Sequence, residues 1–374
     1  MERSIHRRDA FSQHNIEPIG TGPYHVKTIT RDRSGLISEY VLAAAPNATP
    51  VNIQEIRVRF FTNEETLLEA LKTGAINSTA GLNEHLAEVA SLSGYTVEES
   101  PLPRVFAIYL NQNKSDLLRD QSVRAALNVA LDREAMITQV LNGYGTPAHG
   151  PVPEAFFSAS SSSLKTATDT LAVAAQTLSE GGWEQTEEGT WQHIIDEATT
   201  TLAITIRTAN SPLFEATARF IEESWSELGV VVNVELYEQS DLVQAVIRPR
   251  DYQALLFGAD IGRSLDLYPF WHSAEREDPG LNVALYTNIT TDKLLQDIRV
   301  TQDAETRDEL LQQFEQEVTA EAPAIFLFNP SFVYVMKSGI TSPPLTRMSR
   351  SSERFSSIAD WYMDESRVWS IFAD

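Results

Sequence analysis

The sequence contains no cysteine, so disulfides, zinc–thiolate centres, iron–sulfur clusters and cysteine nucleophiles are all excluded. It also lacks any run of about 18 apolar residues, and no membrane-spanning helix is predicted. Basic residues are scarce: 29 Lys and Arg stand against 52 Asp and Glu, which gives a formal net charge of −23. Nucleic acids and anionic membrane surfaces need a cationic patch, so we expect neither as a partner.

Several motifs of catalysis and nucleotide binding are also missing. There is no Walker loop, no G-x-S-x-G elbow and no H-E-x-x-H. Gly20-Thr21-Gly22 begins like a dinucleotide fingerprint, but Pro23 removes an amide donor and no helix follows, so we interpret the stretch as a turn. The seven histidines are scattered, and none lies three or four residues from another. We therefore predict no metal site and no cofactor.

The length of 374 residues exceeds what one hydrophobic core usually holds, so two lobes are expected. Strand-like and helix-like runs alternate through the second half, which predicts an α/β lobe. The predicted strands cover residues 24–29, 38–45, 104–114, 202–208, 230–238, 252–260, 323–330 and 332–339. The predicted helices cover residues 63–74, 169–180, 212–228, 240–248, 292–300 and 304–322. A serine-rich loop is expected at 155–168.

Residues 120–145 carry several charges in an otherwise apolar run, and these charges are either catalytic or structural. Apolar residues recur at helical spacing on both sides of Asp132. Asp132 stands where a second helix begins, so its carboxylate can accept an amide hydrogen bond, and Glu134 follows where the helix dipole favours negative charge. Gly143 is placed to end that helix in the left-handed conformation. We therefore predict helix capping rather than catalysis.

The segment most typical of a ligand site is 257–288, which follows a predicted buried strand and has no regular pattern for about 30 residues. Ligands of α/β lobes usually bind at the carboxyl ends of strands. Aromatic side chains beside a carboxylate would suit a ligand with an ammonium group and apolar parts. The candidate ligand-binding residues are Asp260, Asp266, Tyr268, Trp271 and Asn282. The alternative is that Tyr268 and Trp271 only pack the segment onto its lobe.

Paired carboxylates are easy to find among 52 acidic residues, so no single pair is informative. A hydrolase that uses two carboxylates across a cleft is the alternative function of another class. The absence of nucleophile and metal motifs favours a binding protein over an enzyme.

Several stretches together resemble the family 5 extracellular solute-binding proteins, the peptide- and nickel-binding components of ABC importers. The stretch 19–24, IGTGPY, resembles a turn of that family's first lobe, and 177–183 and 306–328 resemble its helix-to-turn and return segments. The segments 265–273 and 280–288 are similar to its ligand-side loop. The most characteristic region has two helices and a Gly/Pro-rich loop, here Val123, Arg124, Ala126, Ala130, Asp132, Arg133, Gly143, Gly145, Pro147, Gly150, Pro151 and Pro153. The similarity runs in order through nearly the entire chain.

This resemblance implies a bilobal α/β fold, the type II periplasmic-binding-protein fold, with two crossover strands. Lobe one would comprise 1–107, in part, and 328–374, and lobe two 108–327. The implied function is capture of di- or oligopeptides in an interlobe cleft and delivery to the permease subunits of an ABC transporter, by a monomer without catalytic activity. The implied location is extracellular or periplasmic, with a membrane anchor. Oligosaccharide, nickel chelate or opine are alternative ligands on the same fold.

The sequence departs from the family pattern in two places. It begins about 20 residues before the GTGPY turn, so we expect an N-terminally incomplete first lobe, whose signal or lipid-anchor segment is missing, with an unpaired strand edge or exposed apolar surface. Many relatives have Asp-Pro-Asp where this chain has Leu265-Asp266-Leu267. Asp260 alternatively matches the acidic residue that receives a peptide's amino terminus in oligopeptide binders. The choice between Asp260 and Asp266 stays open.

Overall fold

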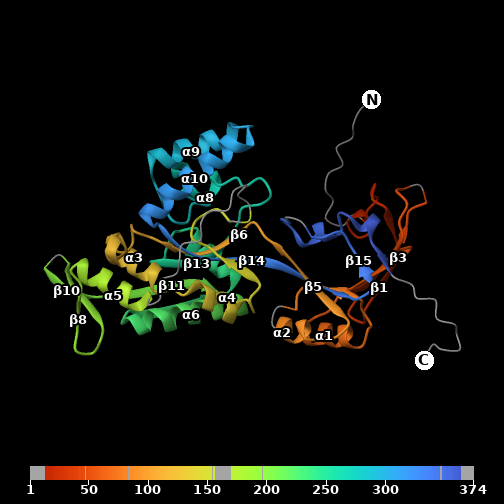
Figure 1. Ribbon diagram of the computed structural model, residues 1–374, viewed down its shortest axis with the longest axis horizontal. Coiled ribbons are helices and arrows are strands. Elements are labelled where there is room, and N and C mark those ends of the chain that lie inside the picture. Colours follow the sequence, from red (N-terminus) through yellow and green to blue (C-terminus); the bar gives the residue numbers. More distant parts are fainter. Residues whose placement is uncertain are drawn as a thin grey trace. The chain divides into compact units, whose positions relative to one another are not determined.

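The computed structural model describes residues 13–46, 48–82, 85–153, 155, 170–195, 197–345 and 348–363, so the predicted serine-rich loop lies outside the described residues apart from Ala155. The chain forms two compact units (Figure 1). The first holds the described residues up to Ser100 and those from Val333 onward, except Met348 and Ser349. The second holds Pro101–Phe332 together with those two residues. The lobe boundaries inferred from the sequence, at 107/108 and 327/328, lie a few residues away from this division.

The second unit is built on a mixed β-sheet with the strand order β12-β11-β13-β6-β14. Strand β11 is parallel to both of its neighbours, whereas β6 is antiparallel to β13 and to β14. The strands are β6 (Arg104–Leu110), β11 (Ala203–Ala209), β12 (Val231–Tyr237), β13 (Ala254–Asp260) and β14 (Ala324–Lys337). Parallel strands need long crossover connections, and the helix between β11 and β12 supplies one.

Alternate side chains of β6 enter two different hydrophobic cores, because successive residues of a strand point to opposite faces. Phe106, Ile108 and Leu110 belong to one core, and Val105, Ala107 and Tyr109 to the other. The first core is closed by α3 (Gln121–Val129), α4 (Arg133–Val140), α5 (Thr170–Glu180) and α6 (Pro212–Leu228). The second is closed by α8 (Tyr268–Trp271), α9 (Ile289–Val300) and α10 (Ala304–Glu321), which Figure 1 shows on the sheet face opposite α6.

The charged run of 120–145 is structural, as predicted. The Asp132 carboxylate accepts a hydrogen bond from the amide of Ala135 (3.0 Å) and begins α4. Gly143 is left-handed (φ 86°) just after the end of that helix. Arg133 is directed inward and donates to the carbonyls of Ala148 and Phe326, at 3.1 and 2.8 Å. These bonds fasten the start of α4 to β14.

The first unit contains an antiparallel sheet in the order β1-β2-β3 and a small hydrophobic core of its own. Its elements are β1 (Tyr24–Arg31), β2 (Ile37–Ala44), β3 (Glu55–Arg59), α1 (Glu64–Lys72), β4 (Ser78–Thr79), α2 (Leu86–Ala90), β5 (Tyr95–Pro101), β15 (Ile340–Thr341) and β16 (Tyr362–Met363). The end of β14 pairs with β4 here. Strands β3 and β4 each stand at the end of their sheet, with one edge unpaired among the described residues.

The structure differs from the predicted elements in several places. The strands predicted at 323–330 and 332–339 are one continuous strand, β14. Pro330 does not break it, because its partner there is the short strand β7 (Gly145–Pro147), where a lost amide donor is tolerated. Strand β3 and the hairpin of β9 (Trp191–Ile195) and β10 (Ala198–Thr201) were not predicted.

Among the helices in the described ranges, none is both long and apolar enough to cross a membrane.

Replacing Asp132 by Ala should lower the free energy of unfolding by about 1 kcal/mol, because the amide of Ala135 loses its cap. Asp132→Asn keeps a side-chain acceptor and should cost only a fraction of that. Urea denaturation of the three proteins measures the difference. Equal destabilisation by both variants would contradict a capping role.

Candidate functional site

The segment after β13 is less irregular than its sequence suggests. It contains α8 and a short 3-10 helix, Ser273–Glu275, before α9 begins at Ile289. Leu265 and Leu285 hold left-handed backbone conformations, with φ of 51° and 57°. Such conformations are strained for leucine and persist where the surroundings fix them, often near functional sites.

Asp266 lies at the end of a stack of four side chains. Its carboxylate accepts two hydrogen bonds from Arg299, from Nε at 2.9 Å and Nη2 at 2.6 Å. The Arg299 guanidinium lies 3.8 Å from the centre of the Tyr268 ring, and that ring stacks on His272 at 4.0 Å. Both faces of Tyr268 are therefore covered, because two groups at these distances cannot share one face. Only the edge and hydroxyl of Tyr268 are left to meet a ligand.

The electrostatics of this stack are those of a satisfied ion pair. The hydrogen bonds from Arg299 hold the pKa of the Asp266 carboxyl below its usual value, and the same contact raises the pKa of the Arg299 guanidinium. An incoming ammonium group would compete with Arg299 for this carboxylate. Both side chains are more than one-third exposed, so water screens the pair and its net contribution to stability is small.

Asp260 closes β13 and is also paired. It lies opposite Arg104 in the antiparallel register of β13 with β6, and Arg104 Nε donates to it at 3.0 Å. Its other oxygen accepts from the amide of Gly262 at 3.1 Å. The Asp260 side chain is 48% exposed, the larger exposure of the two candidate carboxylates. A single hydrogen bond from one guanidinium leaves this carboxylate more accessible than that of Asp266.

Trp271 and Asn282 hold the segment together from inside. Trp271 is 3% exposed and its ring meets those of Tyr109 and Phe326 in the second core. Asn282 is completely buried, and its amide nitrogen donates to the carbonyls of Trp271, His272 and Tyr286. Its oxygen accepts from the amide of Tyr286. Both side chains therefore stabilise the fold of the segment. Trp271 packs the segment onto its lobe, which is the alternative to a direct ligand contact.

Three arginines shape this segment, and sequence reasoning did not identify them. Arg104 and Arg299 neutralise the two aspartates, although they stand 156 and 33 residues away in the sequence. Buried Arg250 donates to the carbonyls of Arg276 and Gly280, at 2.9 and 2.6 Å. No local spacing signals such pairs, because the strand register and helix packing bring the partners together.

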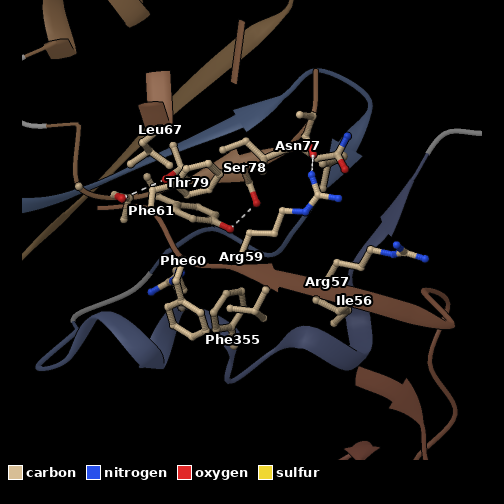
Figure 2. A pocket seen from close by; sticks show the side chains of 18 of the residues that line it. Ile56, Arg57, Arg59, Phe60, Phe61, Leu67, Asn77, Ser78, Thr79 and Phe355 are labelled. Carbon is tan, nitrogen blue, oxygen red and sulfur yellow. Dashed lines mark hydrogen bonds between the residues drawn. The ribbon is translucent and has the colours of Figure 1, made fainter. Parts of the chain in front are cut away.

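A second feature is a groove inside the first unit, here called the β3–β4 groove, with a volume of about 710 Å³. Figure 2 shows side chains from β3, from the Asn77–Thr79 segment and from Phe355 around it. Arg59 reaches across from β3 and donates to the Ala75 carbonyl at 3.1 Å (Figure 2). The Tyr334 hydroxyl donates to Ser78 Oγ at 2.7 Å. Within the described residues, no group of three His, Asp or Glu side chains is arranged to hold a metal ion.

Comparison with known proteins places the chain among solute-binding proteins. The profile described as bacterial extracellular solute-binding proteins, family 5 Middle, matches residues 4–278. The oligopeptide-binding protein AppA of Bacillus subtilis (strain 168) is 29% identical over 228 residues, which cover 60% of this chain and 41% of AppA. The chain spans about half the length of the curated relatives it matches, from 41% of AppA to 61% of the dipeptide-binding protein of Pseudomonas aeruginosa.

Two solved structures show the fold. The structure of AppA from Bacillus subtilis in complex with a nonapeptide has a TM-score of 0.66 at 23% identity and covers 93% of this chain and 67% of AppA. NikZ from Campylobacter jejuni in complex with Ni(L-His) has a TM-score of 0.68 at 20% identity and covers 94% of this chain and 70% of NikZ. The chain has the bilobal α/β fold of these periplasmic binding proteins, as predicted.

Replacing Asp266 by Asn should lower stability at neutral pH by up to about 1 kcal/mol, because the exposed pair with Arg299 loses its charge. The folded pKa of Asp266 is depressed, so the stabilisation is present above the unfolded value of about 3.9 and is lost as pH falls through the folded value. Urea denaturation of both proteins at neutral pH and near pH 3 tests this, and the difference should shrink in acid. A difference that persists unchanged in acid would contradict the ion-pair explanation.

Proposed function

The chain belongs to the bacterial extracellular solute-binding proteins, family 5, and from this premise we propose that it captures peptides and delivers them to an ABC importer. Family membership is the observation that carries the proposal. The names and complexes of its relatives support peptides as the ligand class: AppA of Bacillus subtilis is an oligopeptide-binding protein, and its structure holds a nonapeptide. In this proposal the protein acts as a monomer outside the cytoplasmic membrane, engages permease subunits and performs no catalysis.

In the proposed complex, a carboxylate at the end of β13 or in the segment that follows it receives the peptide's amino terminus. A buried ammonium group without a counter-charge costs several kcal/mol, so peptide capture needs such a group. We prefer Asp260, because it accepts only one hydrogen bond from Arg104 and its side chain is more exposed than that of Asp266. Asp266 is the second choice, since a ligand there must displace two hydrogen bonds from Arg299.

The other candidate residues, Tyr268, Trp271 and Asn282, would have different roles. Tyr268 would present its edge and hydroxyl, since His272 and Arg299 cover its faces. Trp271 and Asn282 would act from behind, by fixing the backbone of the segment. Peptide backbones bound in extended form, with side chains in hydrated pockets, would let one protein accept varied sequences.

The test is calorimetric titration with a set of di-, tri- and oligopeptides, each with a free amino terminus and as its N-acetylated form. Asp260→Asn should weaken binding of the free peptides by about 2 kcal/mol or more, roughly thirtyfold in Kd, and should spare the acetylated peptides by comparison. Asp266→Asn is the matched control at the second carboxylate, and the larger effect identifies the residue.

Other outcomes would replace parts of the proposal. Binding of a nickel chelate, oligosaccharide or opine, with no peptide bound, would keep the family role and change the ligand. Peptide or glycoside hydrolysis that a single Asp substitution abolishes would establish the hydrolase alternative instead. Equal weakening of free and acetylated peptides would remove the amino-terminal role from both aspartates.

A further inference from the structure

The register of β6 on β13 places a charged pair next to an aromatic ring. Arg104 lies opposite Asp260, and two residues along each strand Phe106 lies opposite Gly258. Residues that lie opposite each other, and residues two apart along one strand, point to the same face of a sheet. All four positions therefore share the face of the first core, to which Phe106 belongs. The two pairs are separated by about 7 Å along the strands.

Gly258 leaves room for the Phe106 ring. A Cβ atom at Gly258 would lie 3.0 Å from Cζ of Phe106, a tighter contact than nearly all Cβ atoms make. The ring therefore lies directly on the bare backbone of β13, where glycine permits a close approach. On this face, the neighbour of the charged pair is an aromatic ring and not another side chain of β13.

Phe106 belongs to a group of four rings, here called the aromatic cluster: Phe106, Phe214, Phe257 and Phe328. The Phe106 ring stacks on that of Phe328, with centroids 4.8 Å apart, and its centroid lies 5.4 Å from that of Phe214. The Phe214 ring lies 6.3 Å from that of Phe257. Phe106 and Phe328 are buried, whereas Phe214 and Phe257 are only partly buried. Phe214 and Phe257 thus form the accessible part of the aromatic cluster.

The accessible part of the aromatic cluster lies at the sheet edge that carries Asp260. Strands β11 and β13 are parallel, and Asp260 is the last residue of β13. Phe214 lies in the first turn of α6, which begins three residues after the end of β11. The carboxyl ends of parallel strands meet at one edge of a sheet, where ligands of α/β folds usually bind. One ligand can therefore reach both the carboxylate and the rings.

Arg104 has hydrogen-bond donors that the protein does not use. Its Nε donates to Asp260 at 3.0 Å, and no described residue accepts a hydrogen bond from its terminal nitrogens, Nη1 and Nη2. The side chain is 43% exposed. The amide nitrogen of Asn329 donates to the backbone carbonyl of Arg104 at 2.9 Å, which fixes the start of β6. A guanidinium has five N–H groups in one plane, so those on the terminal nitrogens are available to an acceptor on a ligand.

The charges of this pair determine which ligands gain from both groups. Arg104 and Asp260 together are neutral, so a lone ammonium group is attracted by the carboxylate and repelled by the guanidinium. A ligand gains from both residues when it brings an ammonium group to Asp260 and an oxygen acceptor to Arg104. In a peptide, the first carbonyl group is attached to the same carbon atom as the terminal ammonium group. The pair therefore matches the start of a peptide better than it matches a simple amine.

We propose, on the basis of the function proposed above, that Arg104 is a further ligand-binding residue and that the site selects the first residue of the peptide. Asp260 holds the ammonium group, and Arg104 donates to the first carbonyl oxygen. The first side chain packs on the accessible part of the aromatic cluster. The preferred ligands are peptides with a free amino terminus and a large apolar first residue.

The first experiment is a cycle of two ligands and two proteins, measured by calorimetric titration of the 374-residue chain. The ligands are Phe-Gly-Gly and an analogue whose first peptide bond is a trans carbon–carbon double bond, which keeps the ammonium group and the ring but has no carbonyl. A charge-assisted hydrogen bond is worth about tenfold or more in Kd, so the unaltered protein should bind the peptide about tenfold more tightly than the analogue. Arg104→Met, which has no donors, should bind the two ligands equally.

Two comparisons separate this role from a structural one. The analogue should bind to Arg104→Met up to about fivefold more tightly than to the unaltered protein, because the repulsion from an exposed guanidinium is removed. A variant with a damaged site would instead bind both ligands less tightly. Arg207→Met is the matched control, because Arg207 donates to Glu235 on the neighbouring strand of the same sheet at 2.7 Å. It should leave the Kd of both ligands unchanged.

The second experiment compares peptides that differ only in their first residue. Phe-Gly-Gly and Leu-Gly-Gly should bind about tenfold more tightly than Gly-Gly-Gly, because their side chains leave water at the aromatic cluster. Phe214→Ala should remove most of this preference and leave the Kd of Gly-Gly-Gly unchanged. Phe214→Leu keeps an apolar side chain at the same position and should keep the preference.

Three results would overturn the proposal. Tighter binding of both peptide and analogue by Arg104→Met would mean that Arg104 is only a counter-ion of Asp260. An equal loss of affinity for both ligands would exclude a contact with the carbonyl. Equal affinity of the unaltered protein for Phe-Gly-Gly, Leu-Gly-Gly and Gly-Gly-Gly would exclude the contact with the first side chain. Each of these results leaves peptide capture intact, whereas failure of the unaltered protein to bind any peptide would overturn the proposed function as well.

Discussion

The antiparallel pairing of β6 with β13 and β14 is the constraint on which the second unit depends. The backbone amides and carbonyls of these strands must be hydrogen-bonded once they are buried, and the strand pairing provides this. Their side chains project from both faces of the sheet. One face of β6 needs the cover of α3 to α6, and the other needs α8 to α10. The register of β6 on β13 also sets Arg104 opposite Asp260. The position of a candidate ligand carboxylate thus follows from the central strand pairing.

Arginines that donate to backbone carbonyls, rather than ion pairs, connect the helices of this unit to one another and to the sheet. Burial lowers the pKa of Arg133 to about 10, and the guanidinium is compensated by backbone carbonyls. Arg124 similarly donates to the carbonyls of Leu118, Arg119 and Glu321, which ties α3 to the end of α10. A planar fork of five donors can satisfy several helix and loop ends at once, which a lysine cannot. This explains why charged residues recur in this apolar stretch.

The sequence predicted most of this architecture because its signals are local. Helix α6 begins and ends where the pattern of 212–228 places it, and Asp132 caps α4 as its position indicated. Strand β3 was not recognised although Ile56 and Val58 alternate with charged residues, because it is only five residues long and none of its residues is fully buried. The candidate site was the least predictable part. Whether Asp266 is available to a ligand depends on Arg299, and whether Asn282 is exposed depends on how α8 packs. Both are consequences of tertiary structure that no spacing encodes.

The ion pairs of the candidate ligand site restrict which ligands can gain free energy by binding there. At the segment after β13 the charges are already paired, so a ligand gains only the difference between its own contact and the one it displaces from Arg104 or Arg299. This favours ligands with a strong, localised charge, such as a terminal ammonium.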